Sequence, residues 1–187
     1  FYGTNTTEKV AAMQLLNDIP FFENTHFSAL KLPYKNDKYT MTVLLPKENK
    51  TTTDIINLFT TNNWKSWNKN FTVQPINLTL PKFKSSYKKQ LNNTLTALGL
   101  ENAFSNSANF KAISNTALKI SYVLQKTFIE VNEKGTEAAA VTAVGFINTS
   151  VQPNKIVTIN KPFLYTITEK ETGSICFIGK IGMPKNE

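Results

Sequence analysis

The feature that most constrains the fold is a long run of alternating side chains over residues 117–131. Leu118, Ile120, Tyr122 and Leu124 follow one another at a spacing of two. This period predicts a strand, and ~15 residues is far more than the usual ~5–6. Strands of that length belong to large central sheets, so the sequence predicts that residues 117–131 form part of such a sheet.

The segment that follows, from Gly135 to Asn154, shows the pattern of neither a helix nor a strand. It is small, polar and nearly free of charge. Its alanines favour a helix by propensity, but no apolar stripe runs along it. An irregular stretch of ~20 residues is uncommon inside a compact domain and usually has a functional role.

Three further regions have the pattern of β-structure. Residues 20–45 are rich in strand formers and contain turn residues at 35–37, which predicts a hairpin. Residues 71–83 alternate between apolar and polar side chains, which predicts another strand. The carboxy-terminal residues predict a second hairpin with its turn at 171–173, and we expect Cys176 within it to be a small core residue.

Helical patterns occur in three places. Residues 51–60 begin with threonines that suit an N-cap and carry an early Asp, which favours a helix. Trp64 and Trp67 share a face at a spacing of i, i+3, which predicts a second short helix. A leucine stripe over residues 88–104 predicts a third, with Gly99 as its C-cap. Helices and strands together indicate the α+β class.

Composition excludes several kinds of partner. The formal net charge is +8, yet all 21 basic residues are lysines. Arginine is the preferred residue for bidentate contacts to phosphates and bases, so its absence argues against a nucleic-acid partner. No apolar run reaches the ~18 residues of a membrane-spanning helix, so we expect no membrane span.

The inventory of reactive side chains is equally poor. The chain has one histidine, His26, and one cysteine. A Ser-His-Asp or Cys-His site would have to use His26, which we expect to be an ordinary surface or turn residue. A zinc site needs three or four ligands, and this inventory offers too few. We therefore expect a protein that is not an enzyme and that uses no metal or cofactor.

Five segments in order along the chain resemble one family, the serpins. NEKGTEAAAVTA, from Asn132 to Ala143, is similar to the hinge of the serpin reactive-centre loop. NKPFLYTITEKETGSICFIGKIGMP, from Asn160 to Pro184, resembles the terminal pair of serpin strands. LKLPYKNDKYTMTVLLP, LTLPKFKSSY and LTALGLENAFSNSANFKAIS resemble further serpin segments. The resemblance covers essentially all of the 187 residues.

The resemblance implies a partial serpin fold of the α+β class. Its parts would be strands of a large central sheet, a carboxy-terminal barrel-like sheet, few helices and an exposed reactive-centre loop at residues 135–157. A serpin is much longer than this chain, so residues 1–187 would be the carboxy-terminal part of a single serpin domain. The amino-terminal half would then be a missing partner, and the expected location is extracellular, cell-surface or periplasmic.

The resemblance also implies a function, the inhibition of serine proteases as a suicide substrate. The protease serine attacks the scissile bond, and the cleaved loop then inserts as a new strand into the central sheet. Alternation would place Thr136, Ala138 and Ala140 on the face that enters the core, and none of them is charged. The implied hinge residues are Gly135, Thr136, Glu137, Ala138, Ala139 and Ala140.

The same resemblance implies a reactive bond and a class of target. Counting from the hinge glycine gives the bond Thr149–Ser150, whereas counting back from the carboxy-terminal side gives Val151, so the window is Asn148 to Val151. Thr or Val suits a small apolar pocket, and the window contains no Lys or Arg. The expected partner is therefore an elastase-like or subtilisin-like serine protease, not a trypsin-like one.

One more pair is implied, and two alternatives stay open. Glu133 and Lys82 resemble a salt-bridged pair at the top of the serpin sheet, where insertion begins, and a surface pair of this kind is worth ~0–1 kcal/mol. The first alternative is a non-inhibitory serpin-fold binding or chaperone-like protein. The second is an inactive half-serpin fragment that associates through the exposed edge of residues 117–131.

Overall fold

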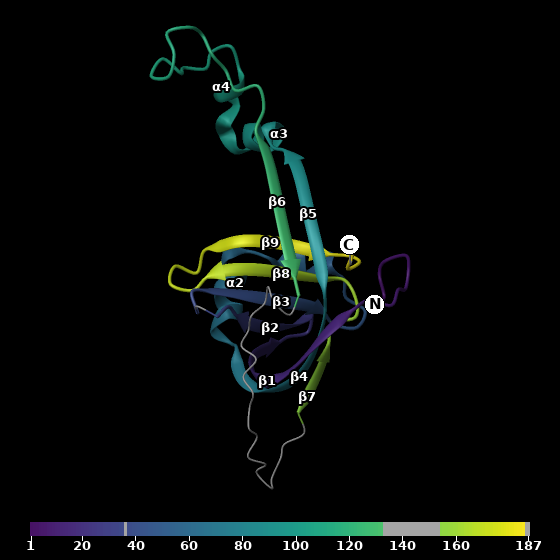
Figure 1. Cartoon of the computed structure of the whole chain (residues 1–187). Coiled ribbons are helices and arrows are strands. Elements are labelled where there is room, and N and C mark those ends of the chain that lie inside the picture. Colours follow the sequence, from purple (N-terminus) through teal and green to yellow (C-terminus); the bar gives the residue numbers. More distant parts are fainter. Residues whose placement is uncertain (36, 133–153, 186–187) are drawn as a thin grey trace. The chain divides into compact units, whose positions relative to one another are not determined.

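The structure, a computed structural model, describes residues 1–35, 37–132 and 154–185 (Figure 1). The chain divides into two compact units. The first comprises residues 1–84 and 130–187, and the second comprises residues 85–129. Most of the buried side chains belong to the first unit.

Seven strands of the first unit form one sheet in the order β7-β4-β1-β2-β3-β8-β9 (Figure 1). All neighbours pair antiparallel except β4 and β7, which are parallel. The longest pairing joins β1 and β4, from Ala12 opposite Pro81 to Phe21 opposite Thr72. The strands are β1 (Ala12–Glu23), β2 (Phe27–Pro33), β3 (Tyr39–Pro46), β4 (Thr72–Pro81), β7 (Lys155–Thr158), β8 (Phe163–Glu169) and β9 (Ile175–Ile181).

Both predicted hairpins are confirmed, and each turn has an identifiable cause. Between β2 and β3, the Tyr34 amide donates to the Tyr39 carbonyl at 2.9 Å, and Asp37 takes a φ of 52°. Between β8 and β9, Gly173 takes a φ of 70°, a region that favours glycine. Beside it, the Glu169 carboxylate accepts the Thr172 amide at 2.7 Å, so side-chain hydrogen bonds close this turn.

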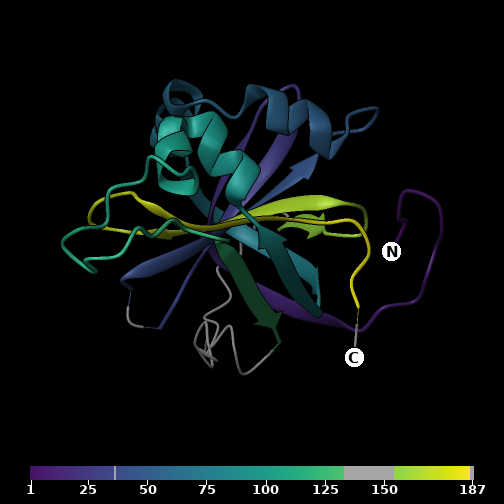
Figure 2. The same cartoon turned by 90° about the horizontal axis from the view of Figure 1, so that it is seen from above.

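Two predicted helices, α1 (Thr52–Leu58) and α2 (Thr61–Lys69), are also confirmed. A capping box starts α1, because the Thr51 hydroxyl accepts the Asp54 amide while the Asp54 carboxylate accepts the Thr51 amide. Ile55 and Trp67 bury their side chains against Phe27, Leu44 and Leu164 of the sheet. Figure 2 shows the two helices, in blue, together on one side of the strands, so they cover that face.

The opposite face of the sheet has its own core. Leu30, Val43 and Tyr165 lie on it, since their Cα atoms are register partners across β2, β3 and β8. Phe83 packs there, with its ring 5.6 Å from that of Phe163. Burying a side chain of this size contributes about 1.5–3 kcal/mol. Both faces of the central strands are therefore covered by side chains of this chain.

The second sheet contains two strands, β5 (Phe83–Gln90) and β6 (Leu124–Val131). The prediction of one strand over residues 117–131 is wrong in its first half. Residues 118–123 join no strand of the described residues. β5 ends at Gln90, and beyond it the Leu91 amide donates to the Val123 carbonyl while the Asn92 side chain bonds the Ser121 carbonyl and the Val123 amide. A strand needs a paired neighbour, and a period of two does not supply one.

The predicted helix over residues 88–104 is shorter and interrupted. Residues 88–90 belong to β5. The remainder forms α3 (Asn92–Leu95), a π-helical turn η1 (Thr96–Leu100) and α4 (Glu101–Phe104). Gly99 takes a φ of 94°, the left-handed conformation expected of a C-cap, but the chain resumes its helix after it. The glycine thus produces a kink in place of an end.

Other expectations require correction. Cys176 is exposed, because the described residues leave most of the first five side chains of β9 uncovered. The first strand begins at Ala12, well before residue 20, and β7 was not expected. Residues 155–157, which we assigned to the end of the loop, lie in β7.

Candidate functional site

The predicted reactive-centre loop joins β6 to β7. The implied hinge, Gly135 to Ala140, and the implied reactive bond, Thr149–Ser150, lie outside the described residues. The described flanks are Asn132, directly after β6, and Asn154, directly before β7. We call the first flank the entry end and the second the exit end.

At the entry end, one carboxylate makes two contacts. The Asn132 side-chain amide donates to Glu130 at 2.8 Å. The Lys84 ammonium lies 3.6 Å from the same carboxylate oxygen, and the two charged side chains are 42% and 37% exposed. An ion pair this open to water is weak, so this contact by itself contributes little to holding the entry end.

Lys82, one member of the implied salt bridge, lies beside the entry end. It follows β4 directly, and its amide donates to the Ala11 carbonyl at 2.9 Å. Its side chain helps to line a small pocket of about 320 Å³ together with Lys84, Glu130 and Asn132. Glu133 lies outside the described residues, so the pairing of Glu133 with Lys82 stays a prediction.

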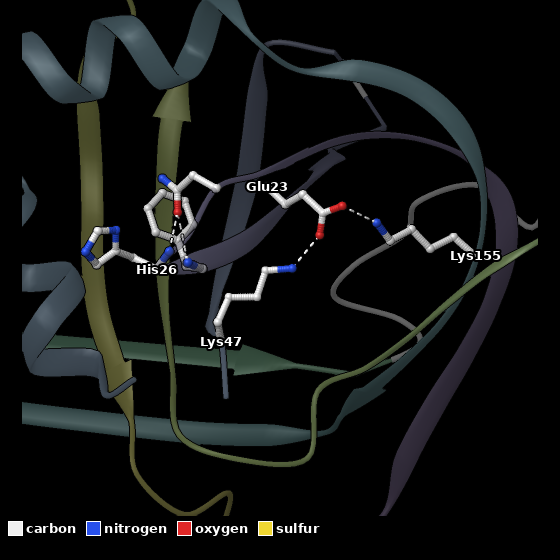
Figure 3. Close-up of polar contacts among 6 residues, drawn as sticks. Glu23, His26, Lys47 and Lys155 are labelled. Carbon is white, nitrogen blue, oxygen red and sulfur yellow. Dashed lines mark hydrogen bonds and ion pairs between the residues drawn. The ribbon is translucent and has the colours of Figure 1, made fainter. Parts of the chain in front are cut away.

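The exit end is held by a carboxylate between two lysines (Figure 3). The Lys155 ammonium lies 2.6 Å from one oxygen of Glu23, and Lys47 pairs with the other oxygen. The Lys155 ammonium also lies 4.1 Å from the centre of the Phe21 ring. Hydrogen bonds from Lys155 and then Lys47 hold the pKa of Glu23 below its ordinary value of 4.5, against a smaller opposing effect of burial.

Strand register explains why these side chains meet. Phe21 and Glu23 are two residues apart on β1, so they share one face of the sheet. Asn17 on β1 faces Ile76 on β4, and Ile76 faces Lys155 on β7. Lys155 therefore emerges on the same face as Phe21 and Glu23. Lys47 arrives from the end of β3, where its amide donates to the His26 carbonyl at 2.8 Å.

Sequence reasoning missed this cluster. Glu23 and Lys155 are 132 positions apart, and no local pattern connects them. Lys161, in the segment that resembles the terminal pair of serpin strands, does contribute nearby, since its ammonium donates to the Lys47 carbonyl at 3.1 Å. Only the fold of β1, β3, β4 and β7 brings the four segments together.

The histidine lies where the sequence predicted, in the turn between β1 and β2. Its amide donates to the Asn24 side chain at 2.8 Å, and its Nδ1 lies 3.0 Å from the Thr25 hydroxyl. Within the described ranges, no three metal-ligating side chains gather together. The helices of those ranges are also too short or too polar to cross a membrane.

A separate groove lies between α2 and the β8–β9 hairpin. Its volume is about 770 Å³, and its lining combines Phe59 and Trp64 with Lys31, Lys65 and Lys170. The Phe59 and Trp64 rings stack at 5.1 Å. Burial lowers the pKa of Lys31, whose ammonium lies 4.3 Å from the centre of the Phe71 ring. The groove thus offers an aromatic wall with cationic groups around it.

Comparison with known proteins gives one consistent result. The model of the family Serpin (serine protease inhibitor) matches residues 1–184. An uncharacterized serpin-like protein of Methanosarcina acetivorans is 35% identical, over 100% of this chain and 45% of that protein. Iripin-2 of Ixodes ricinus is 34% identical over 97% of this chain and 46% of that protein. Serpin B4 of Homo sapiens is 33% identical over 96% of this chain and 48% of that protein.

Solved structures agree. The thermophilic serpin Tengpin in its native state superimposes with a TM-score of 0.78 at 32% identity, over 94% of this chain and 46% of that one. A thyroxine-binding globulin in complex with thyroxine gives a TM-score of 0.83 at 27% identity, over 97% of this chain and 48% of that one. The chain spans about half the length of the relatives it matches. The predicted family is confirmed: this chain belongs to the serpins.

Proposed function

We propose that this chain is the carboxy-terminal part of an inhibitor of serine proteases that acts as a suicide substrate. The protease cleaves the reactive-centre loop, and the loop then inserts into the central sheet while the acyl-enzyme is still intact. Membership of the serpin family supports inhibition in general, and the names of relatives such as Intracellular coagulation inhibitor 2 of Tachypleus tridentatus agree with it. On this proposal, the full-length protein comprises this chain and a preceding amino-terminal part.

The observation that carries the proposal is the composition of the hinge. A strand that enters a sheet between two others must bury alternate side chains, and an unpaired charge would oppose burial. After Gly135, the alternate residues Thr136, Ala138 and Ala140 are small and uncharged. The one charge of the hinge, Glu137, lies in the opposite register. This pattern is suited to insertion.

The reactive window supports an elastase-like or subtilisin-like target. Asn148 to Val151 contains no basic residue, so a protease pocket that requires Lys or Arg would not accept it. The test is to incubate the full-length protein with elastase-like, subtilisin-like and trypsin-like proteases and to run denaturing gels. We expect a covalent complex with the first two and none with the third, and the mass of the released peptide should locate the bond in the window.

Thermal stability provides an independent test. If cleavage releases strain, a molecule nicked between Asn148 and Val151 should melt at a clearly higher temperature than the intact one. The control is the same nicked protein carrying a charge at an inward hinge position, which should gain nothing. An unchanged melting temperature of the nicked protein would falsify the insertion mechanism.

A second candidate is a non-inhibitory serpin that binds a small molecule. The observation in its favour is the close structural match to a globulin solved in complex with thyroxine, together with the aromatic groove beside α2. The denaturing gel separates the two candidates, because a carrier protein would be cleaved by protease without forming a covalent complex.

A further inference from the structure

The strand that follows the predicted loop is weakly held by its backbone. β7 has four residues, and among the described strands its one neighbour is β4, with register pairs from Ile76–Lys155 to Thr79–Thr158. The pairing is parallel, which is slightly less stable per residue than the antiparallel kind. Val157 and Ile159 are buried, while Ile156 is 73% exposed. So short a strand depends on contacts of its side chains to stay in place.

Lys155 supplies such contacts at the first position of β7. Its ammonium lies 2.6 Å from a Glu23 oxygen and 4.1 Å from the centre of the Phe21 ring. A charge-assisted hydrogen bond and a cation–π contact therefore act on one ammonium group. Both partners belong to β1, which lies two strands away from β7 in the sheet. The side chain of Lys155 thus reaches across β4 to a second strand.

The Glu23 carboxylate is itself fixed in direction. Lys47 pairs with the oxygen that Lys155 does not use, and the Lys47 amide is bonded to the turn between β1 and β2. Glu23 faces Ser28 in the β1–β2 register, and Phe27 faces Pro46 beside Lys47. The carboxylate is therefore held by Lys47 on one oxygen while Lys155 contacts the other (Figure 3).

The geometry points to Glu23 as a positioning residue that fastens the exit end of the reactive-centre loop to the sheet through Lys155. This inference rests on the proposed function, because it concerns how that loop is presented. A fixed exit end restricts the conformations of the intact loop, so a larger fraction is ready for the protease. We call the contact of Glu23 with Lys155 the Glu23 clamp. After cleavage only the entry end has to move, so the clamp no longer matters.

The first test measures the clamp without any protease. Hydrogen exchange of the amides of residues 155–159 is followed in the full-length protein and in Glu23→Gln and Lys155→Met. We expect exchange about twofold to fivefold faster in both variants, the range for a partly exposed ion pair. Lys155→Met should show the larger effect because it also loses the Phe21 contact, and Glu23→Gln should add nothing to it in the double variant.

The matched control is Asp37→Asn, which removes another exposed ion pair, that of Asp37 with Lys170 on the β8–β9 turn. It should leave the exchange of residues 155–159 unchanged. If Glu23→Gln behaves like Asp37→Asn, or if its effect on residues 155–159 is undiminished in a Lys155→Met background, the clamp does not exist. If Glu23→Gln fails to fold, hydrogen exchange of residues 155–159 in Lys155→Met decides the same question.

The second test uses inhibition. The rate constant for association with the target protease should fall in Glu23→Gln by about the same factor as the protection of residues 155–159. The number of inhibitor molecules consumed per protease should stay constant, because the choice between trapping and turnover follows cleavage. A change in that number with an unchanged association rate would overturn the inference. Absence of any complex with the unaltered protein would instead contradict the proposed function, while the exchange data would still decide the clamp.

Discussion

The two ends of the predicted loop are anchored very differently. The entry end continues β6, a strand of a two-stranded sheet in which Val131 is buried while Phe128 is 62% exposed. The exit end begins β7, in a seven-stranded sheet where Val157 and Ile159 are buried. Among the described residues, the entry end shows the Lys84–Glu130 ion pair at 3.6 Å, whereas the exit end shows a carboxylate shared by two lysines.

This difference agrees with what an inserting loop requires. An element that moves must have few buried contacts and exposed hydrogen bonds, and an element that stays must have more. Within the described residues, the ion pairs separate the two ends in this way, while β6 and β7 each have both buried and exposed side chains. If the proposed function holds, the asymmetry is part of the mechanism, and four changes, in decreasing order of expected effect, test it.

The largest effect is expected at the entry end, from Thr136→Arg in the full-length protein. The charge would have to enter the sheet, which costs several kcal/mol without a partner. The variant should be cleaved as an ordinary substrate. The number of inhibitor molecules consumed for each protease molecule trapped should therefore rise at least about tenfold. Glu137→Arg is the matched control, since it places the same charge in the opposite register, and it should still trap the protease. If both variants still trap the protease, the claim that the entry end inserts into the sheet is wrong.

The next effect concerns packing at the β8–β9 edge of the same sheet, which is the edge opposite β7. A Cβ at Gly179 would lie 2.5 Å from ring atoms of Tyr165, its register partner on β8. Gly179→Ala should therefore lower the free energy of unfolding by about 1–3 kcal/mol through overpacking. Gly182→Ala is the control, because a Cβ there meets nothing within 4 Å. Equal melting temperatures for the two variants would show that the sheet is less tightly packed than described.

The third change is acidification, which should act on the exit end. The pKa of Glu23 is lowered by hydrogen bonds from Lys155 and Lys47. A carboxyl group of this kind stabilises the fold above its unfolded pKa, and the stabilisation is lost as pH falls through the lower, folded pKa. Protection of residues 155–159 should fall by up to about fivefold between about pH 5 and pH 3. In Glu23→Gln this loss should be absent, and an identical loss in both proteins would assign it elsewhere.

The smallest effect is expected from Lys84→Met at the entry end. Its ion pair with Glu130 is more than one-third exposed on both sides, so its removal should cost less than about 0.5 kcal/mol. Chemical denaturation of the full-length protein measures this cost. If Lys84→Met lowers the free energy of unfolding as much as Lys155→Met or more, the exit end is not the more firmly held of the two ends.

Local chemistry made much of the fold predictable. The threonines and Asp54 at the start of α1, the spacing of the two tryptophans in α2 and the turn residues of both hairpins all act within a few positions of one another. The structure confirms each of them. The family was also predictable, because five separate segments matched it in order.

Long-range pairing accounts for most of what was missed. Residues 12–19 contain adjacent leucines, Asn and Asp, a poor strand pattern, yet they form β1 because β4 pairs with every one of them. β7 is too short to show a period. The run 117–131 showed the period, but its first half pairs with no strand of the described residues. The Glu23 clamp depends on four strands at once, so no local rule could find it.

The exposed Cys176 on β9 makes the surroundings of that strand measurable. It is the only thiol in the chain, so one maleimide dye would label a single known position. Rapid labelling of the 187-residue chain and slow labelling of the full-length protein would show that preceding residues shield the last strand. On the proposal above, the modification rate of this one sulfur atom therefore reports how the chain assembles with the preceding part.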